Sequence, residues 1–390
     1  MKHASQIYLI STVLSLIFAP VLLADEQVVR ARDLGLPFEG TTGPLNAITD
    51  VKGVTVGHET IIHDLENGKA VRTGVTAILP RGRASDTLPA FGASFSLNGN
   101  GEMTGRAWLE ESGLLEGPVL ITNTHSVGAV HQGTIEWRVE QGNADSSGYW
   151  WSLPVVAETW DGYLNDINGF HVKSEHAKAA LNNAKPGAVA EGNVGGGTGM
   201  ICHDFKCGIG TSSRIVETID GPFTVGVLVQ ANYGTRETLR VLGVPVGKHL
   251  QDDLAYNEPD APKSDTGSII IVVATDAPLL PHQMKRLARR AALGLARNGS
   301  FAGNGSGDIF IAFSTANEDA SQSGPASTVK MISNDEIDPL FLGTVRATEE
   351  AIINALVAAK DMTGQNGRQA KSISHTALQR VMAEHNRLNN

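Results

Sequence analysis

The chain has 390 residues, of which 41% are hydrophobic and 18% charged, a composition that suits one large or two ordinary globular domains. Its formal net charge of −10, with no compensating basic stripe, argues against a nucleic-acid-binding protein. The chain has two cysteines, Cys202 and Cys207, with His203 between them. These are too few ligands for a typical zinc site, so we expect no metal and leave buried thiols and a local disulfide both open.

Residues 1–24 have the pattern of a signal peptide. Lys2 precedes an apolar stretch from residue 7 to residue 23, and Ala24 offers a small residue at the cleavage point. The stretch is short and is broken by Pro20, which disfavours a membrane span. We therefore expect a periplasmic or secreted mature chain without a membrane segment, and an uncleaved N-terminal anchor is the alternative.

The remaining chain alternates strand-like and helix-like segments. Runs rich in β-branched residues between glycine and proline signals predict strands over 51–58, 73–79, 89–96, 119–122, 155–160, 223–230, 269–274 and 309–313. Helical spacing of apolar residues predicts helices over 106–111, 127–138, 171–183, 282–298 and 342–362, with a polar, partly helical tail after 363. This order suggests helices layered outside two packed sheets.

Two glycine-rich loops, at 98–105 and 191–199, interrupt these segments. Glycine permits close approach of the backbone to a ligand, although tight turns between strands explain the same composition. Neither loop has the strand, glycine and helix context of a nucleotide site, so we expect no nucleotide cofactor. A G-x-S-x-G elbow and an H-E-x-x-H motif are also missing from the sequence, and nothing in it points to a Ser-His-Asp triad.

Ser268 marks the sharpest change of character in the chain. A polar, acidic, proline-bearing stretch, 251–266, runs through Gly267 into the continuous apolar run 269–274, which is typical of a buried strand. A serine at this position can become the new N-terminus of a chain that cuts itself. Its hydroxyl then lies beside its own α-amine, whose pKa is near ~8. That amine is a built-in general base for the nucleophile.

Ser306 and Asp308 precede the next apolar run, 309–313. If this strand pairs with 269–274 through the helix 282–298, both side chains come near Ser268 and can bond its hydroxyl or its amine. A carboxylate there favours the ammonium form of the amine. Taken alone, however, Gly-Ser-Gly-Asp also fits an ordinary turn.

Taken together, these features resemble the P1 family (S58) of N-terminal-nucleophile aminopeptidases, which contains the DmpA-like L-aminopeptidase/D-amidase-esterases and the β-peptidyl aminopeptidases. The resemblance runs from Arg32 to about Met362. The segments that carry it, in order, are 46–58, 73–76, 99–105, 154–162, 164–169, 192–199, 229–232, 267–268 and 303–308. Each segment is weak evidence alone, and the ordered set is specific.

The resemblance implies an α+β fold, a four-layer αββα sandwich of the DmpA/ornithine-acetyltransferase type. It also implies self-cleavage between Gly267 and Ser268. The products would be an α chain, residues 25–267, and a β chain, residues 268–390, which together build one catalytic domain. Members of this family assemble as homotetramers, so a homotetramer is expected.

The resemblance also assigns roles to residues of the site. Ser306 and Asp308 support the nucleophile Ser268, and the amide N–H of Asn232 stabilises the oxyanion. Glu158 holds the free ammonium of the substrate, and Trp160 lines that pocket at a position where the DmpA branch carries tyrosine. Without the resemblance, Glu158 reads as a strand-end acid facing solvent and Asn232 as a turn residue.

The sequence thus predicts an exported, self-processing serine aminopeptidase that needs no cofactor. It would release N-terminal residues from short peptides, amides or esters, with a preference for β-peptides, and peptide-bond synthesis is a side activity of the same acyl-enzyme. An L-aminopeptidase/D-alanine esterase-amidase is the close alternative. The alternatives from other classes are an ornithine-acetyltransferase-like acyltransferase, which uses threonine as nucleophile, and a non-enzymatic exported binding protein.

Overall fold

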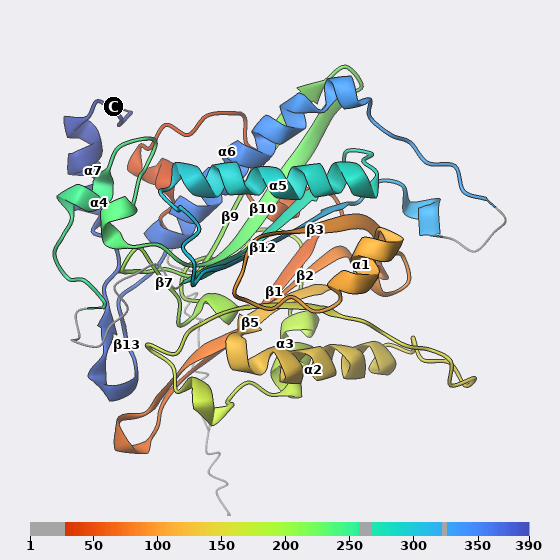
Figure 1. The fold of residues 1–390 in the computed structure, drawn as a ribbon, viewed down its shortest axis with the longest axis horizontal. Helices are drawn as coiled ribbons and strands as arrows, with labels where there is room; N and C mark the ends of the chain where they lie inside the picture. The colour runs from red at the N-terminus through yellow and green to blue at the C-terminus, as the bar shows by residue number, and fades with distance from the viewer. Residues whose placement is uncertain (1–27, 257–266, 322–325, 390) are drawn as a thin grey trace, which may run out of the picture.

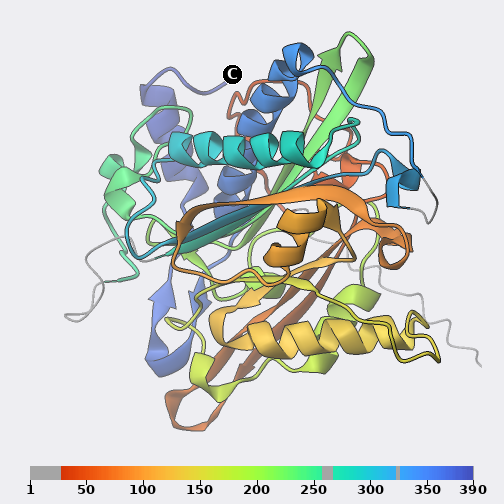
Figure 2. The same cartoon turned by 45° about the vertical axis from the view of Figure 1, so that its right-hand side comes forward.

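The protein is an α+β sandwich in which two β-sheets pack face to face and each outer face carries helices. This computed structural model describes residues 28–256, 267–321 and 326–389. Figures 1 and 2 show the four layers, with α5 and α6 on one side of the paired sheets and α2 and α3 on the other. The expected αββα architecture is confirmed. The predicted signal peptide, 1–24, and residues 257–266 of the polar stretch lie outside the described residues.

The larger sheet has six strands in the order β4-β3-β12-β11-β10-β9 and the smaller has four in the order β1-β2-β5-β6. Two neighbouring pairs, β11–β12 and β5–β6, are parallel, and the other pairs within these two sheets are antiparallel. The strands of the larger sheet are β3 (Ala90–Gly99), β4 (Leu114–Leu115), β9 (Ile209–Thr218), β10 (Gly221–Asn232), β11 (Ser268–Thr275) and β12 (Gly307–Ser314). Those of the smaller sheet are β1 (Thr55–Asp64), β2 (Ala70–Arg83), β5 (Val119–Asn123) and β6 (Val155–Thr159).

Strand β11 shows how the sequence fills two cores at once. Successive side chains of a strand point to opposite faces of the sheet. Ile270, Val272 and Ala274 therefore pack between the sheets, whereas the odd-numbered residues from Ile269 to Val273 pack under the helices. A strand buried on both faces needs apolar residues at every position, which is why 269–274 is a continuous apolar run. The same alternation determines on which face of the sheet the side chains of Ser268 and Asp308 lie, at the starts of β11 and β12.

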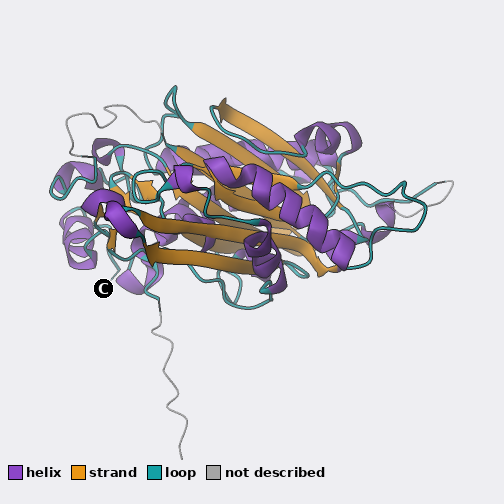
Figure 3. Ribbon diagram, turned by 90° about the horizontal axis from the view of Figure 1, so that it is seen from below, coloured by secondary structure: helices purple, strands orange, loops and turns teal. Residues whose placement is uncertain are grey.

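Helices α5 (Pro281–Arg297) and α6 (Asp338–Val357) cover the six-stranded sheet, and α2 (Val127–Glu140) and α3 (Ser174–Asn182) cover the four-stranded one. Helix α5 connects the parallel strands β11 and β12, as the sequence predicted. Gly294 allows close contact with α6, because a Cβ there would lie 2.6 Å from Thr348 Cβ. Helices α1 (Arg106–Ser112), α4 (Val246–His249) and α7 (His375–Glu384) lie at the ends of the sandwich. Seen from below in Figure 3, the long helices run over the strands. Within the described part of the chain, no helix has the length and apolar character needed to cross a bilayer.

The structure differs from the sequence-based expectation at the last long helix and at strand β9. The helix expected over 342–362 spans Asp338–Val357, with proline in its first turn, and the chain then forms the short ribbon of β13 (Met362–Thr363) and β14 (Gln369–Ala370). Strand β9 was not predicted, and the polar residues Ser212, Ser213 and Arg214 lie at its centre. All three are buried and hydrogen-bonded in the structure.

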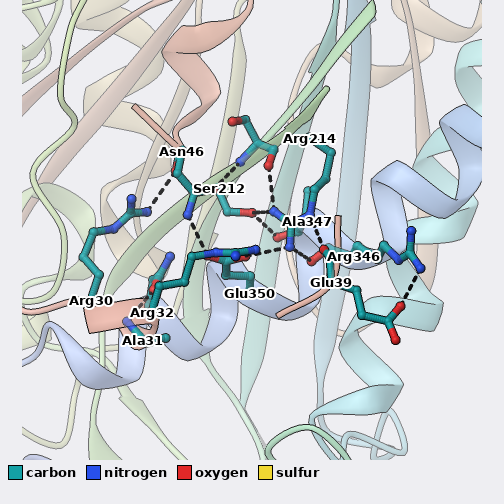
Figure 4. A network of polar contacts seen from close by, with 12 residues as sticks. Arg30, Ala31, Arg32, Glu39, Asn46, Ser212, Arg214, Arg346, Ala347 and Glu350 are labelled. Carbon is teal, nitrogen blue, oxygen red and sulfur yellow. Dashed lines mark hydrogen bonds and ion pairs between the residues drawn. The ribbon is translucent and has the colours of Figure 1, made fainter. Parts of the chain in front are cut away.

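A buried ionic network joins distant parts of the chain (Figure 4). The Glu350 carboxylate of α6 accepts hydrogen bonds from Arg32 at 2.8 and 2.9 Å and from Arg214 of β9 at 2.6 Å. Asn46 donates a further bond to it at 2.6 Å. Although burial alone would raise the pKa of Glu350, the bonds and charges of Arg32 and Arg214 hold it below the ordinary value. Burial also lowers the pKa of Arg214, but a guanidinium starts so high that it stays protonated.

Cys202 and Cys207 form a disulfide, which resolves the alternative left open by the sequence. The bond closes a small hairpin made by β7 (Ile201–Cys202) and β8 (Phe205–Lys206), beside the end of β10. Because the hairpin is fixed at this point, it can present the backbone of Ile201 to Asn232.

Candidate active site

Ser268 is the first residue of β11, in the interior of the six-stranded sheet, and is only 5% exposed. Its neighbours across the strands are Asn232 on β10 and Gly307 on β12. The Gly307 N–H donates to Ser268 Oγ at 3.3 Å and to the Gly267 carbonyl at 3.2 Å. The hydroxyl and the preceding peptide carbonyl therefore share one backbone donor.

Gly267 is held tightly between Ser268 and the end of β10. A Cβ at Gly267 would lie 2.1 Å from the carbonyl oxygen of Asn232 and 2.5 Å from Tyr233 Cα. Contacts this short cannot be relieved without moving backbone, so the position requires glycine. In the uncut chain, Gly267 thus packs directly over Asn232.

Asn232 ends β10 on the same face of the sheet as Ser268, because directly paired residues point the same way. Its side-chain oxygen accepts the Ile201 N–H at 2.9 Å, which orients the amide. Among the described residues none accepts a hydrogen bond from Asn232 Nδ2. The amide nitrogen is thereby left as a donor next to the serine hydroxyl, the requirement for an oxyanion-stabilising group.

Ser306 and Asp308 form a buried pair at the start of β12, where Ser306 Oγ donates to Asp308 Oδ1 at 2.6 Å. Asp308 is paired with Ile269 and shares its face with Phe310, so its carboxylate points toward the helix layer. Ser268 points the other way, toward the smaller sheet. The pair therefore lies on the face of the sheet opposite the Ser268 hydroxyl.

A cavity of about 490 Å³ opens in front of Ser268. Its wall combines the start of β11 with loops of the larger sheet and with the carboxyl ends of β5 and β6 of the smaller one. The lining residues are Asn100, Gly101, Glu102, Thr124, Glu158, Trp160, Ser268 and Gly305. Asn232, Ser306 and Asp308 are not among the residues that line this cavity.

Glu158, near the end of β6, is 3% exposed, so the reading of a solvent-facing acid is wrong. Its Oε1 accepts the Glu102 N–H at 3.0 Å, and its Oε2 accepts the Thr124 hydroxyl. Burial raises the pKa of Glu158 above the ordinary value, and these two hydrogen bonds oppose the rise. No lysine or arginine is bonded to Glu158 in the described structure. A buried carboxylate without a protein cation is well suited to hold an ammonium group of a ligand.

Trp160 directly follows β6 and is 41% exposed at the mouth of the cavity. Gly162 lets the indole lie against the backbone, since a Cβ there would lie 2.6 Å from the ring. Ser268, Glu158 and Trp160, which sequence patterns pointed to, all line this cavity. Thr124 and Glu102 also line it, and no sequence pattern pointed to them. Both lie in loops that meet Glu158 only through the fold, although Glu102 falls within the glycine-rich loop 98–105.

Comparison with known proteins agrees with this geometry. The model of Peptidase family S58 matches residues 46–370. Beta-peptidyl aminopeptidase BapA of Sphingosinicella microcystinivorans is 51% identical over 391 residues, which cover 95% of this chain and 97% of the relative. The protein of the same name from Sphingosinicella xenopeptidilytica is 49% identical, covering 90% of each chain.

Two solved structures show the same fold. The L-aminopeptidase D-Ala-esterase/amidase of Ochrobactrum anthropi, described as a variant of the Ntn hydrolase fold, has a TM-score of 0.86 at 48% identity and covers 92% of this chain and 99% of its own. A Burkholderia β-aminopeptidase has a TM-score of 0.82 at 48% identity and covers 91% and 99%. The chain therefore belongs to peptidase family S58, and it is a serine aminopeptidase with the N-terminal-nucleophile hydrolase fold.

Proposed function

We propose that this enzyme cuts itself before Ser268 and then uses Ser268 to release N-terminal residues from short β-peptides. The observation that carries the proposal is the cavity shared by Ser268 and Glu158. A nucleophile lies on one part of its wall, and a buried carboxylate suited to an ammonium lies on another. The spacing of these two groups would select substrates by the distance between the free amine and the carbonyl that is attacked.

Self-cleavage would begin with attack of Ser268 Oγ on the carbonyl carbon of Gly267. The Gly307 N–H, 3.2 Å from the Gly267 oxygen, is in place to stabilise the negative charge that develops there. The C–N bond breaks, the proton from Oγ ends on the nitrogen, and water hydrolyses the resulting ester. The products are an α chain ending at Gly267 and a β chain starting at Ser268 with a free amine. Departure of Gly267 would also uncover Asn232.

In turnover, the freed amine takes the proton from Ser268 Oγ as the oxygen attacks the substrate carbonyl. Asn232 Nδ2 donates to the oxyanion, and the Ser306–Asp308 pair stabilises the ammonium from the other face of the sheet. The amine then returns the proton to the leaving group. Water hydrolyses the acyl-enzyme, or a second amine captures it to form a new peptide bond.

Two substrate classes have support. Similarity to the relatives named β-peptidyl aminopeptidases supports β-peptides as substrates of this enzyme. Similarity to the Ochrobactrum L-aminopeptidase D-Ala-esterase/amidase supports L-α-peptides or D-alanyl compounds. The test is a comparison of kcat/KM for β-homoalanyl and L-alanyl p-nitroanilides. A clear preference for the β-homoalanyl compound is expected, whereas a preference for L-alanyl turnover would assign the enzyme to the alternative class.

Export and assembly belong to the same proposal. Residues 1–24 would be removed on export to the periplasm or medium, and the processed α and β chains would form a homotetramer. N-terminal sequencing of the secreted protein is expected to find one end near residue 25 and a second at Ser268. Light scattering should give four times the mass of one α–β unit, and any other mass would reject the tetramer.

A further inference from the structure

A second carboxylate, that of Glu102, lines the same cavity. Glu102 is exposed, and its backbone N–H donates to Glu158 Oε1 at 3.0 Å, which fixes the loop beside the recognition carboxylate. Burial is the main cause of the raised pKa of Glu158, and the negative charge of Glu102 adds to it. The two carboxylates are therefore close enough to influence one another.

The cavity does not neutralise this second charge. None of the described residues on its wall is a lysine or an arginine, and Glu102 has no ion pair with any described residue. His125 is the nearby titratable group of opposite sign. Its charged form lowers the pKa of Glu158, and its ring stacks on Phe170 with centroids 6.1 Å apart. The described residues of the cavity wall thus include two carboxylates and no lysine or arginine.

One substrate ammonium suffices for Glu158, which leaves the charge of Glu102 for another part of the substrate. We propose that Glu102 is a specificity-determining residue: it favours N-terminal residues whose side chain carries a second positive charge over neutral side chains of the same length. This inference rests on the proposed aminopeptidase site, since it assumes that the N-terminal residue occupies this cavity. The proposal predicts that substrates with a lysine-like N-terminal residue are preferred and that those with an acidic N-terminal residue are disfavoured.

The size of the effect follows from exposure. Glu102 is solvated, so its attraction to a side-chain ammonium a few ångströms away is that of a surface pair, which corresponds to about two- to fivefold in kcat/KM. The same exposure makes the preference sensitive to salt. It should shrink as ionic strength rises toward about 1 M, where charges are screened over a few ångströms.

The test compares β-homolysyl and β-homonorleucyl p-nitroanilides, which differ in the side-chain ammonium, at about pH 8. The wild-type enzyme is expected to favour the lysyl substrate, and Glu102→Gln should show no preference between the two substrates. Glu111→Gln is the matched control, because Glu111 is exposed on α1 and does not line the cavity.

The result has a distinct meaning for each proposal. Turnover of the neutral substrate by the wild-type enzyme tests the aminopeptidase site itself. An unchanged lysyl preference in Glu102→Gln, an equal loss in Glu111→Gln, or no preference in the wild type would overturn the role of Glu102. An SDS gel of each variant shows whether processing was intact, so that only comparably cut enzymes are compared.

Discussion

Ser268 and Asp308 stand at the starts of adjacent parallel strands, and their side chains leave the sheet on opposite faces. The hydroxyl of Ser268 faces the cavity between the sheets, whereas the carboxylate of Asp308 faces the helix layer, bonded by Ser306. The sheet itself thus separates the nucleophilic oxygen from the acid that would tune its amine. Asp308 therefore acts, in our proposal, through the nitrogen of Ser268 and without touching the substrate.

In our proposal the single hydroxyl of Ser268 performs both the self-cleavage and the catalysis, and replacing Ser268 with alanine removes it. We expect Ser268→Ala to migrate as one band on SDS gels where the wild type gives two, and to hydrolyse no aminoacyl p-nitroanilide. Circular dichroism should show an intact fold. An active Ser268→Ala protein would exclude the mechanism.

Asp308→Asn should alter the pH dependence of the reaction. A carboxylate near an amine stabilises the ammonium form and raises the amine pKa, so its removal should shift the acid limb of kcat/KM to lower pH. The rate is expected to fall about tenfold or more, in the range of acid–base assistance. Ser306→Ala, which removes the bond to Asp308, should show a weaker form of the same shift. If the acid limb of the kcat/KM profile does not move in either variant, the Ser306–Asp308 pair has only a structural role.

Glu158 should control substrate binding in a pH-dependent way. Binding of the substrate ammonium requires the ionised carboxylate, and burial raises the pKa of Glu158. KM should therefore increase as the pH falls through this raised value, starting at a higher pH than for an exposed glutamate. Glu158→Gln should raise KM by about ten- to a hundredfold, the range expected for a charge-assisted hydrogen bond, and remove that pH limb.

The matched control for Glu158 is a substrate analogue without the amine. It should be hydrolysed equally poorly by the wild type and by Glu158→Gln. If the variant instead lost kcat at unchanged KM, Glu158 would belong to the chemistry and not to recognition.

The disulfide should support Asn232 as well as the fold. Cys202 follows Ile201, whose N–H orients the Asn232 side chain. Cys202→Ser with Cys207→Ser is expected to lower the free energy of unfolding by about 2 kcal/mol, the chain-entropy value for such a short loop. Because the hairpin orients Asn232, the double variant should also lower kcat by a larger factor than it raises KM. Urea unfolding and steady-state kinetics of the double variant measure the two effects. An unchanged kcat would show that the disulfide-closed hairpin is not needed to position Asn232 for catalysis.

The Glu350 network should stabilise the protein most at neutral pH. Its lowered pKa means that the carboxylate contributes stability above the unfolded-state pKa and loses it as the pH falls through the folded-state value. Glu350→Gln leaves Arg214 buried without its counter-charge and should cost about 3 kcal/mol in urea unfolding at neutral pH. The variant should also show a smaller loss of stability on acidification. An acid response equal to that of the wild type would contradict this role.

The sequence predicted those features that depend on local patterns. The apolar run 269–274 and the abrupt start at Ser268 are visible without a structure, because a strand buried on both faces leaves no polar position. Strand β9 was missed because no local pattern shows that Arg214 is buried, and its charged partner Glu350 lies more than a hundred residues away. The meeting of Glu158 and Glu102 arises where two sheets and a loop converge, which no local pattern encodes.

The position of Gly267–Ser268 within the six-stranded sheet has a consequence for the order of events. The proposed cut would leave β11 and β12 on the short chain, flanked by β10 and β3 of the long one. Neither product contains the complete six-stranded sheet, so each chain alone lacks its partner's hydrogen bonds and core there. The Gly267–Ser268 peptide bond is then needed while the sheet assembles, and it can be lost afterwards. Separately produced halves should fail to regenerate the enzyme, while the cut enzyme should behave as one unit on heating.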